Sequence, residues 1–292
     1  MSSSVEAKKA WVRALERTAA IERHPRRTLP VIIEELAACH ESAPALASPE
    51  GSLSYRALAQ SANRHARWAL AQGLQPGDVV CLLMDNCPSY MAVWLGLTRV
   101  GVTAALLNAH LTGEPLLHSI RIVAPRALIA GPGFSDRLLA GPAAIAASLP
   151  CWIHGEGPAP LRRMDEALAG CCAEPLTDAE RTAPSLSDRA LYIYTSGTTG
   201  LPKAAVVSHH RLIQWSHWFA GLMDITPPDR LYDCLPMYHS VGGLVATGAT
   251  LVGGWHRRGA GAVLGQPLLA GCPGGALYNL PVHWRAVPVP RE

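Results

Sequence analysis

The amino-acid sequence predicts an α/β fold in which parallel βαβ sheets are flanked by helices. Three short, continuously apolar segments carry this prediction: DVVCLLM at 78–84, TAALLN at 103–108 and RALIA at 126–130. Segments with apolar residues at helical spacing stand between them, and the connections are short. Strands of this kind are covered on both faces, and the alternation of strand and helix makes successive strands parallel.

The helix that precedes the first of these strands has a defined start and stop. Residues 54–72, SYRALAQSANRHARWALAQ, open on Ser54 in the N-cap position, and apolar residues recur every three or four positions from Leu58 to Ala69. Gly73 follows, at the position where a left-handed residue ends a helix. We therefore expect a helix with one apolar face.

The remaining elements follow from the same signals. The sequence predicts helices over 88–100, ended by Gly101, and over 113–123, ended before Pro125. Pro and Gly are dense over 131–186, where the pattern predicts no clear element. Further along, it predicts strands over 190–195 and 204–208, a helix with apolar Leu212, Trp215, Phe219 and Leu222, and a short strand within 230–236.

These elements divide the chain into four predicted parts. They are an N-terminal arm (1–27), a first α/β subdomain (28–185), the beginning of a second α/β subdomain with a polar loop (186–254), and a tail of different character (255–292).

Composition excludes several classes of protein. Hydrophobic residues make up 49% and charged residues 16% of the chain, which supports a sizeable core and argues against disorder. The net charge of +3 is too small to predict a nucleic-acid partner. The eight cysteines contain no CxxC pair, which favours reduced thiols in a cytoplasmic protein.

The sequence predicts neither a signal peptide nor a membrane-spanning helix. The first residues are too charged for a signal peptide, and no stretch of about 18 residues is uninterruptedly apolar. Peripheral association with the inner face of a membrane is left open, as is the oligomeric state.

The segment LYIYTSGTTGLPKAAVV, residues 191–207, places a polar loop between two apolar strands. Glycine permits positive φ and lets main-chain N–H groups approach a ligand, while hydroxyls and a lysine add further donors. Such a loop suits the oxygens of a polyphosphate. The predicted binding residues are Thr195, Ser196, Gly197, Thr198, Thr199, Gly200 and Lys203.

Lys203 is unusual, because the chain has only three lysines among its 25 basic residues and the other two are Lys8 and Lys9. Two other interpretations of the loop remain open: a plain polar turn in a hairpin, and a nucleotidase of the P-loop type. The P-loop requires GxxxxGK followed by Ser or Thr, whereas Lys203 stands between Pro202 and Ala204. The sequence therefore argues against a P-loop.

The stretch YTSGTTGLPK resembles the phosphate-loop signature of the AMP-forming adenylate synthetases, which include acyl-CoA synthetases, peptide-synthetase adenylation domains and luciferases. Residues 52–108 are similar to the first subdomain of that superfamily, and CLPMYHSVGG at 234–243 is similar to its next core motif. The resemblance implies that residues 195–200 and Lys203 hold the phosphates of ATP. It also implies that Tyr238 and His239 lie beside the acyl and adenylate site, and that Lys203 and His239 are catalytic.

Two further stretches, TLPVIIEELAACH at 28–40 and LYIYTSGTTGLPKAAVVSH at 191–209, look like the fatty-acid transport protein branch, the long- and very-long-chain acyl-CoA synthetases. This branch implies ATP, Mg²⁺ and coenzyme A as cofactors and co-substrates, with a long-chain fatty acid as substrate. Two other functions stay open. One is a non-catalytic fragment with at most weak nucleotide binding, and the other is a fatty-acid uptake protein of the same family.

Other clusters of polar residues predict no metal site. His209–His210 and Cys171–Cys172 are adjacent pairs, and adjacent side chains on a strand or a helix point apart. Asp233 and Cys234 are interpreted as structural.

The tail changes character after Gly254, since residues 255–292 contain no Lys or Asp and are dense in Gly and Pro. When the last two bases of each codon are joined to the first base of the next, permitted codons turn VLGQPLLAG at 263–271 into FSASRFWQD. In the same frame VHWRAVPV at 282–289 becomes YIGELCRY, and both runs resemble the same branch. We therefore expect a tail that is either disordered or frameshifted, and the resemblance implies that the second subdomain before it is incomplete. The resemblance also implies that adenine, ribose and Mg²⁺ ligands and a CoA-presenting lid are missing, so that these 292 residues form an inactive fragment.

Overall fold

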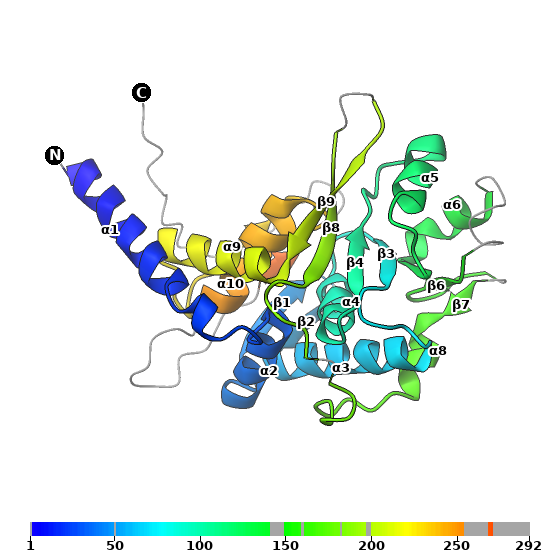
Figure 1. Cartoon of the computed structure of the whole chain (residues 1–292), viewed down its shortest axis with the longest axis horizontal. Helices are drawn as coiled ribbons and strands as arrows, with labels where there is room; N and C mark the ends of the chain where they lie inside the picture. Colours follow the sequence, from blue (N-terminus) through cyan, green and yellow to red (C-terminus); the bar gives the residue numbers. More distant parts are fainter. Residues whose placement is uncertain are drawn as a thin grey trace.

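A large β-sheet forms the centre of the fold (Figure 1). The computed structural model describes residues 2–49, 51–140, 149–158, 161–181, 183–196, 200–253 and 268–270. The strand order is β7-β6-β5-β3-β4-β8-β9, and every neighbouring pair from β7 to β8 is parallel. The strands span Val79–Leu83 (β3), Thr103–Leu106 (β4), Ala127–Ala130 (β5), Cys151–Ile153 (β6), Arg162–Arg163 (β7), Arg189–Thr195 (β8) and Lys203–Ser208 (β9).

The predicted parallel sheet is confirmed, with an exception at its edge. Strands β3, β4 and β5 are buried at every residue and lie within the three apolar segments that predicted them. β9 instead runs antiparallel to β8, so that the two form a hairpin. A parallel pair needs a crossover of a dozen or more residues, and the loop between these strands is too short to supply one.

A smaller sheet joins distant parts of the chain in the order β10-β11-β1-β2. β1 (Pro44–Ser48) and β2 (Gly51–Ser54) are antiparallel, whereas β11 (Leu268–Ala270) runs parallel to both β1 and β10 (Tyr232–Asp233). β11 belongs to the predicted tail, and the rest of 255–292 lies outside the described residues. The division of the chain into four parts stays a prediction.

Helices α3 (Tyr55–Ala71) and α4 (Pro88–Arg99) pack against each other beside the large sheet (Figure 1). The Ser54 hydroxyl oxygen accepts a hydrogen bond from the Ala57 N–H at 3.1 Å, and Gly73 has φ +72°, so the predicted start and stop of α3 are confirmed. The close approach of the two helices requires Gly96, because a Cβ there would collide with the carbonyl oxygen of Ala62.

The other helices are α1 (Ser2–Thr18), α2 (Leu29–Cys39), α5 (Gly113–Arg121), α6 (Ser135–Ala140), α8 (Met164–Ala169), α9 (His209–Leu222) and α10 (Gly248–Gly253). Several of these lie where the sequence predicted no helix, among them α1 in the predicted arm and α6 and α8 in the stretch 131–186. Single 3₁₀ turns occupy Ile21–Arg23 (η1) and Pro132–Phe134 (η2), and a π-helix occupies Ser240–Thr247 (η3).

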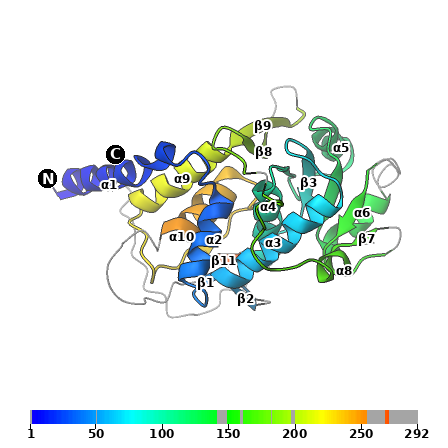
Figure 2. The same cartoon turned by 60° about the horizontal axis from the view of Figure 1, so that its bottom comes forward.

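The N-terminal helix α1 lies along α9 and projects from the body of the molecule (Figure 2). The Arg13 guanidinium donates to the carbonyl of Gly221 at 3.2 Å, and Arg17 donates to those of Gly253 and Ile225 at 3.0 and 3.1 Å. A Cβ on Gly221 would lie 2.6 Å from the Cα of Ala14, so only glycine permits this close approach. The predicted arm is therefore a helix bonded to residues near the opposite end of the described chain.

Candidate functional site

The predicted phosphate loop connects β8 to β9 at the edge of the large sheet where its parallel strands end. Thr195 pairs with Lys203 in the last rung of the hairpin, and residues directly opposite each other in such a pair project to the same face. Thr195, Ser196 and Lys203 are exposed, and Gly200 has φ +87°. The strands predicted on both sides are confirmed. The remaining predicted loop residues, Gly197, Thr198 and Thr199, lie outside the described residues.

Two contacts from helix α5 hold this hairpin on either side of the loop. The buried Tyr194 hydroxyl donates to the carbonyl of Ser119 at 2.7 Å, just before the loop. Just after it, Nε2 of His118 lies 3.1 Å from the carbonyl oxygen of Pro202, and the histidine must donate because a carbonyl can only accept. Burial raises the pKa of Tyr194, so its hydroxyl keeps the proton that it donates. Both arms of the loop are thus fixed to one helix.

The second predicted segment, residues 235–239, carries Tyr238 and His239 immediately before the π-helix η3. Tyr238 is buried, and its ring centroid lies 4.6 Å from that of His239, which is exposed at the N-cap of η3. His110, in the connection after β4, stacks edge-on against Tyr238 with centroids 6.4 Å apart. Burial raises the pKa of Tyr238, and the nearby Asp85 adds to this effect. The arrangement presents the His239 imidazole to solvent, and π-helical turns are frequent at functional sites.

Both segments meet at one edge of the large sheet. Asn86, which follows β3, hydrogen-bonds the main chain of Leu235 and Met237, and His110 follows β4. β4 lies between β3 and β8, and all three strands run parallel, so their carboxyl ends bring the 235–239 segment and the phosphate loop to the same edge. The carboxyl ends of parallel strands are where open α/β sheets bind ligands.

Three polar residues of this edge were not predicted from the sequence, namely Asn86, His110 and His118. A signal for the first two was present, because each stands two residues after a segment that was predicted as a parallel strand. His118 lies within a helix and gave no comparable signal, since its contact with Pro202 depends on how α5 packs against the hairpin.

Asp233 lies buried in β10 and connects the beginning of the 235–239 segment to the end of the π-helix. Its Oδ1 accepts from the Leu235 N–H at 3.1 Å, and its Oδ2 lies 3.2 Å from the Thr247 hydroxyl. Burial raises the pKa of Asp233 to about 6, and the two hydrogen bonds oppose this only in part. These contacts agree with the structural interpretation of Asp233, while Cys234 beside it is exposed.

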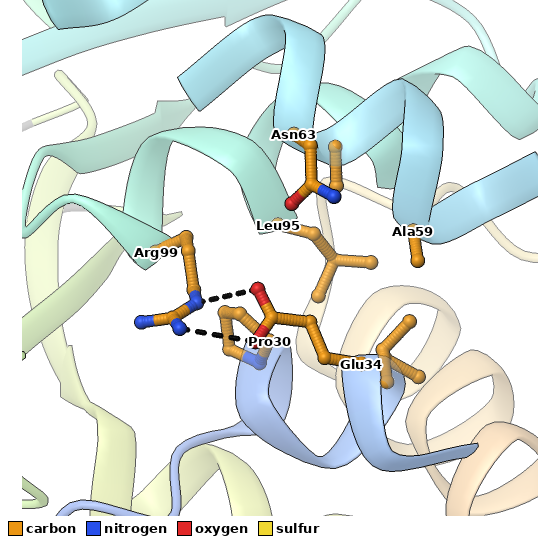
Figure 3. A pocket seen from close by; sticks show the side chains of 8 residues that line it. Pro30, Glu34, Ala59, Asn63, Leu95 and Arg99 are labelled. Carbon is orange, nitrogen blue, oxygen red and sulfur yellow. Dashed lines mark hydrogen bonds and ion pairs between the residues drawn. The ribbon is translucent and has the colours of Figure 1, made fainter. Parts of the chain in front are cut away.

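A cavity between α2, α3 and α4 contains none of the predicted site residues (Figure 3). An ion pair crosses it, with Arg99 Nε 2.8 Å from Glu34 Oε1 and a second guanidinium nitrogen 3.0 Å from Oε2. Its lining residues are Pro30, Ile33, Glu34, Ala59, Ala62, Asn63, Leu95 and Arg99. The paired charges join α2 to α4, and the cavity is a packing feature of the fold.

Within the described residues, no three His, Cys, Asp or Glu side chains come together in a way that could hold a metal ion. Across the same part of the chain, no helix combines the length and the apolar character needed to cross a membrane.

Known proteins are similar to this chain over a stretch that includes both segments of the site. A family model described as "AMP-binding enzyme" matches residues 33–256. Long-chain fatty acid transport protein 1 of Rattus norvegicus is 34% identical over 243 residues, covering 80% of this chain and 37% of that protein. The medium/long-chain-fatty-acid–CoA ligase FadD6 of Mycobacterium tuberculosis is 35% identical over 207 residues, covering 68% of this chain and 33% of the ligase. The chain thus spans about a third of the length of these relatives.

Solved structures share the fold. ATP-bound MatB from Rhodopseudomonas palustris is similar with a TM-score of 0.66 and 29% identity, over 78% of this chain and 44% of MatB. The anthranilate CoA ligase AuaEII, in complex with anthranoyl-AMP, has a TM-score of 0.70 at 19% identity, over 83% of this chain and 44% of AuaEII. At 19% identity, the likeness to AuaEII concerns the fold alone.

Proposed function

Because the chain belongs to the AMP-binding enzyme family, we propose that it contributes the phosphate loop and part of the acyl site to an enzyme that activates a long-chain fatty acid with ATP. The observation that carries the proposal is the exposed rung of Thr195 and Lys203, at the same sheet edge as Tyr238 and His239. Relatives named as fatty acid transport proteins and as a fatty-acid–CoA ligase support the choice of substrate.

A carboxylate does not react with a thiol unaided, because it has no good leaving group. Activation with ATP overcomes this in two steps. In the first step, a carboxylate oxygen attacks the α-phosphorus of ATP, a P–O bond forms, and the bond to pyrophosphate breaks. In the second step, the thiol of coenzyme A attacks the acyl carbonyl, loses its proton, and AMP leaves. Phosphoryl chemistry of this kind depends on positioning and on the stabilisation of charge.

The residues take separate roles in the first step. The hydroxyls of residues 195–200, the main-chain N–H groups of that loop and the Lys203 ammonium hold the phosphates and neutralise pyrophosphate as it leaves. Tyr238 and His239 stand beside the reacting carboxylate and the adenylate. Mg²⁺ would enter bound to the phosphate oxygens of ATP, and these roles of the loop, Tyr238 and His239 do not require the protein itself to hold it.

The surface around His239 suits an apolar substrate. Leu235 and Val241 lie on either side of it in sequence, and their side chains are 43% and 50% exposed. Burying two such side chains against an acyl chain is favourable by about 25 cal/mol per Å² of apolar surface. Fatty-acid uptake is the second candidate function, favoured by the name of the rat relative.

We also propose that the 292 residues by themselves bind nucleotide weakly at best and complete neither half-reaction. The chain spans 37% of the rat relative, and phosphate contacts alone do not fix the adenosine half of ATP. A misplaced α-phosphate loses in-line geometry, and small displacements reduce the rate by large factors.

The experiment compares Lys203→Ala with Lys8→Ala, in a chain that has only three lysines. Lys8 is an exposed lysine on α1 and serves as the charge-matched control. We expect Lys203→Ala to weaken the binding of a fluorescent ATP analogue about tenfold through loss of a charge-assisted contact, and Lys8→Ala to leave it unchanged. Equal affinity in both variants would contradict the phosphate role of Lys203. AMP release by the 292-residue chain that disappears in Lys203→Ala would contradict the expected inactivity.

A further inference from the structure

Asn86 joins the end of β3 to a segment far away in the sequence. Its side-chain Nδ2 donates to the carbonyl of Leu235 at 2.7 Å, and its Oδ1 accepts from the N–H of Met237 at 2.7 Å. The side-chain amide of Asn86 therefore bonds the carbonyl of Leu235 and the N–H of Met237, two residues further on. The main chain of a neighbouring strand would make the same pair of bonds. The two bonds span 149 and 151 positions of sequence.

The other hydrogen bonds of this segment are local. The His239 N–H donates to the carbonyl of Pro236 at 3.0 Å, and the Gly243 N–H donates to the carbonyl of His239 at 2.9 Å. Gly242 packs so closely that a Cβ would lie 2.5 Å from the Pro236 carbonyl oxygen. These contacts determine the shape of the turn that enters η3, but they leave its place relative to the sheet undetermined.

Core packing holds only part of the segment. Met237 and Tyr238 are buried, whereas the side chain of Leu235 is 43% exposed and His239 is exposed. The two bonds of Asn86 act on the main chain on both sides of Pro236, and the second of them is made to Met237, which directly precedes Tyr238. Asn86 is thus a direct polar link between the edge that carries the phosphate loop and the segment that carries His239.

We propose that Asn86 is a positioning residue, which holds Tyr238 and His239 in register with the phosphate loop. This assignment rests on the proposed function in so far as Tyr238 and His239 contact the acyl group and the adenylate. Loss of the two bonds frees the segment to shift from the sheet edge, and a shift of that kind reduces binding at the acyl side while the hairpin at β8 and β9 is undisturbed.

The test uses Asn86→Ala, which removes both bonds, and Asn86→Asp, which keeps the acceptor and loses the donor. Asn63→Ala is the matched control, because the buried Asn63 also donates from Nδ2 to a distant main-chain carbonyl, that of Ala173 at 3.0 Å. Three quantities are measured in each 292-residue protein. They are hydrogen exchange of the amides of residues 235–243, binding of a fluorescent long-chain fatty acid, and binding of a fluorescent ATP analogue.

We expect Asn86→Ala to accelerate exchange at Met237 and His239 and to weaken fatty-acid binding about tenfold, with ATP binding changed by less than about twofold. Asn86→Asp should fall between wild type and Asn86→Ala, because its carboxylate would face the Leu235 carbonyl without a hydrogen. Asn63→Ala should lower stability and leave both affinities as they are.

Two results would overturn the assignment: unchanged exchange over 235–243 in Asn86→Ala, or an equal loss of fatty-acid binding in Asn63→Ala. A wild-type protein that binds neither probe would contradict the phosphate and acyl-site roles proposed for this chain, though not its proposed inactivity. In that case the exchange measurement decides alone whether Asn86 holds the segment, so the two failures are distinguishable.

Discussion

The Nε2 atoms of His65 and His154 lie 3.0 Å apart between α3 and the end of β6. The other ring nitrogen of His65 lies 2.8 Å from the carbonyl oxygen of Ser61, and that of His154 lies 3.2 Å from a carboxylate oxygen of Asp165. A carbonyl can only accept, so Nδ1 of His65 carries its hydrogen and Nε2 of His65 accepts from His154. Burial, with the neighbouring His154, lowers the pKa of His65 to about 3, so this ring stays neutral.

Acid should therefore destabilise the protein through His65. Its pKa in the folded state lies below the value of 6.5 expected when unfolded, so the unfolded chain takes up the proton first. Stability is complete above pH 6.5 and is lost as the pH falls from 6.5 towards 3, with a slope of about 1.4 kcal/mol per pH unit for one proton. We expect His65→Gln, which cannot take up a proton, to show a shallower loss in urea unfolding between pH 7 and about 4.5. His24→Gln, at an exposed site, is the control, and a wild-type slope in His65→Gln would contradict the prediction.

Asp233 should have the opposite pH dependence. Its side chain is 2% exposed, and its pKa is raised from 3.8 to about 6. The stability that its proton confers is complete below pH 3.8 and is lost as the pH rises through about 6. The protonated form can also complete the local bonding. The Thr247 hydroxyl oxygen lies 3.2 Å from Asp233 Oδ2 and 2.9 Å from the carbonyl oxygen of Gly242, and its single hydrogen can serve only one of these acceptors at a time, so a protonated Asp233 can donate to Thr247 while Thr247 donates to Gly242.

A side-chain amide at position 233 would copy the protonated acid at every pH, so we expect Asp233→Asn to remove the loss of stability between pH 4 and about 6. At about pH 7.5 the variant should be at least as stable as wild type. Thermal unfolding across this pH range is the measurement. A variant that is clearly less stable at neutral pH would show that the ionised carboxylate stabilises the fold.

Substitutions at the two ends of the Glu34–Arg99 ion pair, shown in Figure 3, should have strongly non-additive effects on the free energy of unfolding. The Arg99 side chain is 7% exposed, so Glu34→Gln leaves a buried cation without its partner and should cost about 3 kcal/mol. Replacing both residues by apolar ones, as in Glu34→Leu with Arg99→Met, should recover most of that loss. Arg27–Glu35, an exposed pair at the same helix, is the control and should be worth less than about 1 kcal/mol. Additive losses for Glu34 and Arg99 in urea unfolding would contradict this account.

The contact between His118 and Pro202 should matter for nucleotide binding more than for folding. His118→Ala removes a donor that fixes the end of the phosphate loop, and we expect ATP-analogue affinity to fall by about three- to tenfold. His118→Gln retains an N–H donor and should recover most of this affinity, while fatty-acid binding stays at the wild-type value. If His118→Ala and wild type bind the analogue equally, α5 does not position the loop.

The reading frame offers a test that requires no protein. We expect the gene, read one base later from about codon 254, to give a continuous coding region with FSASRFW- and YIGELCRY-like runs followed by Tyr-Gly-x-Thr-Glu. The reason is that both runs arise at one offset and in order. Nucleotide sequencing from about codon 250 onwards decides the matter, and stop codons or unrelated sequence in that frame would exclude it.

The parallel core was predictable because its physical signals are local. Val79–Leu83, Thr103–Leu106 and Ala127–Ala130 are buried throughout, and burial on both faces of a sheet requires a continuously apolar composition. Ser54 and Gly73 likewise marked the ends of α3 through groups within a few residues of each end. The antiparallel direction of β9 follows from the short loop before it, and a hairpin was among the interpretations that this loop left open.

What the sequence could not predict depends on contacts across long separations. Examples are the packing of α1 on α9, the link from Asn86 to Leu235 and the contact of His118 with Pro202. In each case, nothing in the sequence near either partner indicates the contact. The π-helical form of Ser240–Thr247 depends on how its glycines fit under the preceding turn. Resemblance located Lys203 and His239, whereas only the fold brings the segments that carry them to one edge.

The attachment of α1 has a consequence for how the protein is made. Arg17 finds its acceptors on Ile225 and Gly253, 208 and 236 positions later, so α1 leaves the ribosome long before its partners exist. At about 5–20 residues per second, the interval is roughly 10 to 50 s. An isolated helix of this length is marginal in water, and its exposed apolar residues, Val5, Trp11, Val12 and Leu15, stay available to chaperones throughout. Synthesis that stalls before α9 is complete therefore leaves a nascent chain whose first helix is still open to proteases.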